Sequence, residues 1–84
     1  MKMSKKDYSL KFYKGFMTNE NNETYHFYLA ARSASEAYEY LKSYITNHPN
    51  RYHLIPNEND ISEIQVSEVS MESYGKSYGY EVIN

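Results

Sequence analysis

The feature that most constrains the fold of this chain is a change in the spacing of its apolar residues. In residues 8–17, and again in residues 24–31, apolar and polar side chains alternate, which is the period of a β-strand. The polar, asparagine-rich segment 18–23 between them predicts a hairpin turn. From residue 34 the apolar spacing becomes three and four, which is the period of an amphipathic helix. The first half of the chain therefore predicts an antiparallel hairpin followed by a helix.

The predicted helix has a defined start and a defined end. Ser33-Ala34-Ser35-Glu36 is a capping box, in which the Ser33 hydroxyl accepts from the Glu36 backbone N–H while the Glu36 side chain reaches back. The helix should stop near Asn47, because Pro49 disfavours helical geometry in the residue before it. The apolar stripe that would face the sheet consists of Ala34, Ala37, Tyr38, Leu41 and Ile45.

The second half of the chain predicts a long loop and two more strands. Residues 48–60 hold two prolines and three asparagines and predict a connector, in which residues 51–55 could dock as an edge strand or a helical turn. Strand character resumes in residues 62–71 and 77–83, and Gly75-Lys76 predicts a hairpin turn between them.

A bulge is expected within the first of these two strands. Ile64 and Val66 are one residue out of phase with Val69 and Met71, so a bulge near 67–68 would bring all four towards the core. The predicted fold is α+β: one small domain over residues 8–84, in the order β-β-α-β-β, with one helix packed on an antiparallel sheet.

Tyrosine supplies much of the apolar surface of this chain. There are 11 tyrosines in 84 residues, so some of them must enter the core, and Tyr38 and Tyr80 are the expected ones. We expect Leu10, Phe12, Phe27, Leu29 and Ile64 to lie under the helix, and Lys11, Tyr13, His26 and Tyr28 to lie on the open face. The patterns leave a set of tyrosines outside the core as a predicted contact surface: Tyr13, Tyr28, Tyr40, Tyr44 and Tyr52.

Charge is distributed unevenly along the chain. Residues 1–14 hold five lysines and one aspartate, and residues 1–7 are expected to form a flexible basic arm. The remaining residues hold four basic and ten acidic side chains. An acidic stretch in the second half either complements a basic partner surface or is a solvated face. Its members are Glu58, Asp60, Glu63, Glu68 and Glu72.

Several classes of chemistry are disfavoured by the residues present. The chain has no cysteine, which excludes a disulfide, a thiolate metal site and a cysteine nucleophile. Its three histidines do not have metal-ligand spacing, and no phosphate-binding or nucleophile motif occurs. We therefore expect no enzymatic activity, no cofactor and no metal. No apolar run of 18 residues and no secretory signal is present, so a cytoplasmic location without a membrane partner is expected.

The chain resembles a broad class of small accessory proteins. The chain is short and acidic, is rich in Asn, Lys and Tyr, and contains Ala-Arg-Ser-Ala-Ser-Glu-Ala-Tyr-Glu-Tyr-Leu at residues 31–41. In these features it is similar to proteins of phages and mobile elements. These include anti-CRISPR and other anti-defence inhibitors. The resemblance implies stoichiometric binding to a larger partner, such as a CRISPR or other defence nucleoprotein, with acidic residues occupying a nucleic-acid groove.

Three functions follow from these observations. The first is a non-enzymatic protein-binding inhibitor or regulator that blocks a nucleic-acid-binding partner through the tyrosines and the acidic surface. The second is a nucleic-acid-binding module that uses an open aromatic sheet face with Lys11, Tyr13 and Tyr28. The third is a small-molecule-binding domain or a small structural oligomer with Tyr40 and Tyr44 at a subunit interface.

Overall fold

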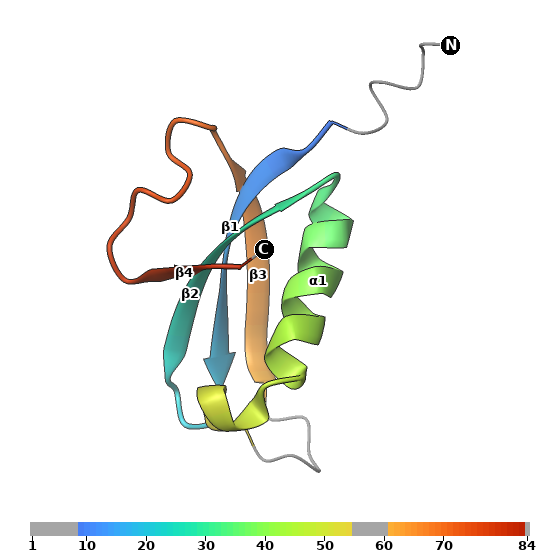
Figure 1. The fold of residues 1–84 in the computed structure, drawn as a ribbon. Coiled ribbons are helices and arrows are strands. Elements are labelled where there is room, and N and C mark those ends of the chain that lie inside the picture. Colours follow the sequence, from blue (N-terminus) through green and yellow to red (C-terminus); the bar gives the residue numbers. More distant parts are fainter. Residues whose placement is uncertain (1–8, 55–60, 84) are drawn as a thin grey trace.

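The protein is one helix packed on a four-stranded sheet (Figure 1). The computed structural model describes residues 9–54 and 61–83. Its elements, in order, are β1 (Lys11–Asn19), β2 (Thr24–Ala31), α1 (Ala34–Thr46), the 3₁₀ turn η2 (Pro49–Tyr52), β3 (Ile61–Val69) and β4 (Tyr80–Val82). The predicted α+β class and the order β-β-α-β-β are confirmed. The predicted basic arm 1–7 and residues 55–60 of the predicted loop lie outside the described residues.

The sheet is mixed, with the strand order β3-β1-β2-β4. β1 pairs antiparallel with both β2 and β3, whereas β4 pairs parallel with β2. The predicted hairpin between the last two strands is therefore wrong, because β3 and β4 lie at opposite edges of the sheet. Residues 70–79 connect these two edges, and Gly75 (φ 74°) and Gly79 (φ 88°) take the left-handed conformations that bend this connection.

The helix begins and ends where the sequence predicts. The Glu36 backbone N–H donates to the Ser33 hydroxyl oxygen at 3.1 Å, and Asn47 is the C-cap. The Glu36 carboxylate accepts from the backbone N–H of Arg32 at 2.6 Å and forms an ion pair with the Arg32 guanidinium. The Glu36 side chain thus accepts from a backbone N–H that precedes the cap residue, while the Glu36 backbone N–H donates to the cap hydroxyl. Both bonds stabilise the first turn of the helix.

The phase of β1 is the reverse of the predicted one. Tyr13 and Met17 are buried beneath the helix, while Phe12 and Phe16 lie half-buried on the open face. Gly15 explains why this face of β1 lies beneath the helix, because a Cβ there would lie 2.8 Å from Leu41 Cδ2. The helix approaches the sheet too closely at this point for any side chain, so this face of β1 turns towards it. In β2 the predicted phase is right: Phe27, Leu29 and Ala31 are buried.

β3 runs without the predicted bulge near Ser67 and Glu68. Its pairing with β1 is regular from Val69 to Glu63, and the register shift lies instead opposite Thr18 and Asn19. Val69 therefore pairs with Phe12 on the open face, and Met71 is 71% exposed. Only Ile64 and Val66 of the four expected apolar residues pack against the core beneath the helix.

The core lies between the helix and the sheet and is sealed by residues from the second half of the chain. Leu41, Ile45 and Ala37 of α1 are fully buried against β1 and β2. Tyr52, Leu54 and Ile83 complete the same cluster. The core thus depends on η2, on the residues directly after it and on the residue that follows β4.

Candidate binding surfaces

An aromatic ladder crosses the open face of the sheet. Each ring contacts the next, with centroid distances between 4.6 and 6.3 Å, and the closest stacked pair is Tyr28 with Tyr80 at 4.6 Å. The ladder draws on β1, β2, β4 and the 70–79 connection, so it is assembled from distant parts of the chain. Its members, in order of contact, are Phe16, His26, Tyr80, Tyr28, Tyr74 and Phe12.

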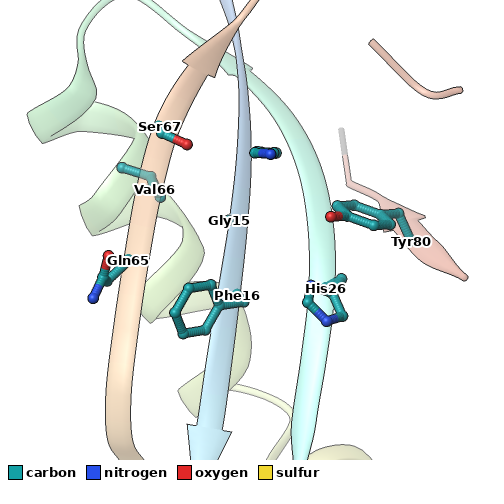
Figure 2. Close-up of a pocket in the computed structure, with 8 residues that line it drawn as sticks. Gly15, Phe16, His26, Gln65, Val66, Ser67 and Tyr80 are labelled. Atoms are coloured by element: carbon teal, nitrogen blue, oxygen red, sulfur yellow. The ribbon is translucent and has the colours of Figure 1, made fainter. Parts of the chain in front are cut away.

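A pocket of about 260 Å³ lies at one end of this ladder (Figure 2). Phe16, His26 and Tyr80 supply its aromatic wall, and Lys14 adds a cation from the same strand as Phe16. Gln65 and Ser67 line the side formed by β3. Figure 2 shows the helix behind the sheet in this view, so the pocket opens on the face that the helix does not cover.

Strand β3 forms a free edge of the sheet. Among the described residues, no strand pairs with its outer side, because it is the last strand in the order β3-β1-β2-β4. Glu63 and Glu68 are exposed along this edge, on opposite faces of the strand. Beside it, Tyr38 and Lys42 of α1 line a groove of about 300 Å³ with Ile64 and its neighbours on β3.

A hydrogen-bonded cluster under the helix fastens β4 in place. The Glu81 carboxylate accepts from the Tyr52 hydroxyl at 2.8 Å and from the Tyr44 hydroxyl at 2.9 Å, and it forms an ion pair with Arg51 at 3.1 Å. Burial, followed by the hydrogen bond to Glu81, raises the pKa of Tyr52 far above its ordinary value. For Tyr44 the hydrogen bond to Glu81 is the main cause of a raised pKa. Since all these groups satisfy one another, the cluster is structural.

A second cluster lies at the turn between β1 and β2. The fully buried Asn19 side-chain amide donates to the Glu23 carboxylate and to the Tyr52 carbonyl oxygen, both at 2.9 Å. The Asn19 amide, and then the His53 ring at 2.9 Å, hold the pKa of Glu23 below its ordinary value. The Tyr25 hydroxyl lies 3.0 Å from the same His53 nitrogen. These bonds join the hairpin to η2.

Three of the tyrosines predicted as a contact surface are buried instead. Tyr13, Tyr28 and Tyr52 are each only 2% exposed. The reasons differ: Tyr13 faces the helix, Tyr52 is held by Glu81, and Tyr28 is on the open face but lies under the rings of Tyr74 and Tyr80. Tyr13 and Tyr52 belong to the core cluster, so the prediction that they lie outside the core is wrong. Tyr28 lies on the open face as expected, but neighbouring rings bury it there.

The other predicted tyrosines are partly accessible. Tyr40 and Tyr44 are half-buried and pack against the edge of the core. Tyr38 and Tyr80, which were expected in the core, are also half-buried, Tyr38 beside the β3 groove and Tyr80 in the open-face pocket. Tyr13 and Tyr52 thus take core positions, whereas Tyr38 and Tyr80 stay partly accessible. The main reasons are that β1 has the opposite phase and that β4 lies beside β2.

The acidic residues that the structure describes are exposed. Glu63 and Glu68 lie on β3, and Glu72 follows in the 70–79 connection. Glu58 and Asp60 fall outside the described residues. Glu63 and Glu68 therefore share one edge strand but lie on its opposite faces, and Glu68 is the register partner of the buried Tyr13.

The pocket residues Phe16 and Lys14 were missed as site residues. The alternation of residues 8–17 contains apolar side chains in both phases, so it does not show which face is open. The signal that could have found them is Gly15, a glycine inside a strand, which marks a close approach of another element. That approach assigns Tyr13 and Met17 to the covered face and Lys14 and Phe16 to the open one.

Among residues 9–54 and 61–83, no group of three or more His, Asp or Glu side chains could hold a metal ion. No helix in this part of the chain has the length and apolar character needed to cross a membrane. The chain matches no protein-family model, no curated protein and no solved structure.

Proposed function

We propose that this protein is a non-enzymatic binding protein that accepts an extended, basic segment of a protein partner along the free edge of β3. The observation that carries the proposal is a nine-residue edge strand with no described neighbour on its outer side. The backbone N–H and C=O groups on such an edge are unpaired, and an added strand satisfies them.

The groove beside β3 supports this mode of binding. Side chains of an added strand alternate between the two faces of the sheet, so every second one would enter the groove between α1 and β3. There it would meet the half-buried ring of Tyr38, the stem of Lys42 and the apolar side chain of Ile64. Backbone bonds would supply affinity and this groove would supply selectivity.

The charges on the edge select the partner. Glu63 and Glu68 are exposed and lie on opposite faces of β3, so a partner strand with basic residues on both faces complements them. Proteins that bind nucleic acid carry basic surfaces of this kind. Covering such a surface would inhibit the partner, which agrees with the resemblance to anti-defence inhibitors and makes inhibition of a nucleic-acid-binding protein our specific proposal.

The first experiment is affinity purification from the native host with matched variants. We expect the wild type to recover a basic protein partner at low salt, and the double variant E63K/E68K to lose it. The control is E39K, which reverses an exposed carboxylate on α1 that does not belong to β3 or line the groove. Equal recovery by all three proteins would remove the acidic edge from the proposal, and recovery of an inert monomer alone would overturn the proposal.

The second experiment locates the contact by hydrogen exchange. On binding, the amides of β3 that point outward should become protected, because they gain hydrogen-bond partners from the added strand. Amides of β2, which lies inside the sheet between β1 and β4, should change little. Protection confined to another element would show that the partner binds elsewhere.

A further inference from the structure

The open-face pocket is organised as two cross-strand rows. Gln65, Phe16, His26 and Tyr80 are register partners across all four strands and form the first row. Ser67, Lys14, Tyr28 and Val82 form the second row in the same way. A row of mutually tilted aromatic rings and a positive charge therefore lie side by side on the sheet.

The first row presents a wall of rings. The His26 ring lies 6.3 Å from the Phe16 ring and 4.9 Å from the Tyr80 ring, measured between centroids. His26 is exposed, and Phe16 and Tyr80 are half-buried, so all three rings are accessible from the pocket. Exposed aromatic rings on a sheet stack with planar bases, and this stacking tolerates any base.

The second row supplies the charge. Lys14 is exposed, and among residues 9–54 and 61–83 no carboxylate forms an ion pair with it. Glu63 accepts a hydrogen bond from the Gln65 amide and lies next to the first row, on the side away from Lys14. An anionic group would therefore bind at Lys14 and avoid the end near Glu63.

We propose that this pocket binds a nucleotide unit, with the base against Phe16, His26 and Tyr80 and the phosphate at Lys14. A nucleotide carries a planar ring system and an anion in one unit, which matches two adjacent rows of this kind. Gln65 and Ser67 offer hydrogen bonds to the edge of the base from β3. The pocket volume of about 260 Å³ suits one such unit. The pocket opens on the face away from α1, whereas the proposed groove lies between α1 and β3, and the two sites share Gln65 of β3.

The test is an NMR titration with adenosine 5′-monophosphate, and with adenosine as the probe that lacks the phosphate. We expect chemical-shift changes at Phe16, His26 and Tyr80 with both probes, and weaker binding of adenosine. Lys14→Gln should weaken the monophosphate by about three- to tenfold and leave adenosine unchanged, since it removes a charge-assisted contact. His26→Ala should weaken both probes by about fivefold or more, because it removes a stacking ring.

Matched controls keep this test falsifiable. Lys11→Gln, on the helix face of β1 opposite Ala31, and His48→Ala, just after α1, remove an exposed lysine and an exposed histidine outside the pocket, and they should leave both affinities unchanged. The dispersion of the amide spectrum checks that each variant is folded. The absence of shifts in the pocket residues at millimolar monophosphate would overturn the proposal, as would equal effects of Lys14→Gln on both probes.

A second arm distinguishes a free nucleotide from a unit within a single strand. A short oligoadenylate that binds much more tightly than the monophosphate indicates a single strand, and equal affinity indicates a free nucleotide. With Lys14 as the only phosphate contact, the logarithm of the strand's binding constant should fall with the logarithm of salt with a slope of about −0.7. A much steeper slope, unaffected by Lys14→Gln, would place the strand elsewhere and contradict the site.

Discussion

The two faces of the sheet use tyrosine in different ways. On the helix face, Tyr52 is 2% exposed and its hydroxyl donates to Glu81, so both its ring and its polar group are fixed within the core. On the open face, Tyr80 is half-buried, and its ring is stacked on Tyr28 and lies beside His26. Tyr52 is thus removed from solvent, whereas Tyr80 stays accessible and covers the buried Tyr28.

Because of this difference, the tyrosines of the two faces should contribute to different properties of the protein, namely its stability and its binding. Burial of a ring whose hydroxyl is satisfied contributes both apolar transfer and a hydrogen bond. A ring stacked on an open sheet gains less from burial and remains accessible to a ligand. We therefore expect substitutions on the helix face to affect mainly the free energy of unfolding, and substitutions on the open face to affect mainly binding.

The largest expected effect is that of Leu41→Ala. Leu41 is fully buried where the helix crosses Gly15, and truncation should lower the free energy of unfolding by about 3 kcal/mol because it leaves a cavity. Phe16→Ala removes a larger side chain from the open face and should cost less. Urea unfolding of both variants measures the difference, and equal losses would break the comparison between the faces.

A substitution of the opposite kind, Gly15→Ala, should cost about 2 kcal/mol by overpacking. The added Cβ would lie 2.8 Å from Leu41 Cδ2 and 3.0 Å from the Gln65 carbonyl oxygen, and the backbone oxygen cannot move away easily. The control is Ser67→Ala on the open face, where no such contact exists. Thermal unfolding checks the prediction, and a neutral Gly15→Ala would show that the helix can shift.

The hydroxyl of Tyr52 should contribute about 1 kcal/mol, because Tyr52→Phe removes a hydrogen bond to Glu81 from a buried site. Because the pKa of Tyr52 is raised in the folded state, its contribution is complete below the unfolded value and is lost as pH rises above about 10. The wild type should therefore lose stability more steeply than Tyr52→Phe in this range.

The matched control for that experiment is Tyr78→Phe, since the Tyr78 side chain is fully exposed. Unfolding by urea at neutral and alkaline pH should give the same profile for Tyr78→Phe and the wild type. An unchanged alkaline profile for Tyr52→Phe would show that Glu81 does not stabilise the neutral phenol in the folded state.

The smallest expected effect is that of His26→Ala on folding. His26 is exposed on the open face, and its loss should change the free energy of unfolding by less than about 0.5 kcal/mol. The same variant is expected to weaken nucleotide binding, so it sharpens the contrast between the two faces. A large loss of stability would show that the aromatic ladder is part of the fold.

Local signals predicted the elements that depend on them. The alternation of residues 24–31 matches β2, and the Ser33 cap and the end near Asn47 match α1, because these patterns act within one turn or one strand. The phase of β1 was not predictable in this way, since Phe12 and Tyr13 are equally plausible core residues. It depends on how closely the helix packs at Gly15, which is a tertiary property.

The candidate sites also consist of residues that local sequence signals predict and residues that depend on tertiary structure. The exposed carboxylates Glu63 and Glu68 were predicted, because exposed acidic residues are visible in the sequence. The row of Phe16, His26 and Tyr80 was not predicted, because it needs the correct phase of β1 and the position of β4 beside β2. A three-residue strand carries no local information about its neighbour or its direction, so only the folded structure shows this row.

The short, distant pairing of β4 makes it a candidate for the first cooperative unit to open under native conditions. It holds its place through three register pairs with β2 and through the bonds of Glu81 to Tyr44 and Tyr52. Pairing β4 with β2 closes a long loop of chain between them, and the few contacts of β4 only slightly exceed the entropy cost of closing it. Transient release of this strand would take Tyr80 away from His26 and make β2 the edge strand in place of β4. A bound ligand that contacts Tyr80 would suppress this opening and slow amide exchange in β2 and β4.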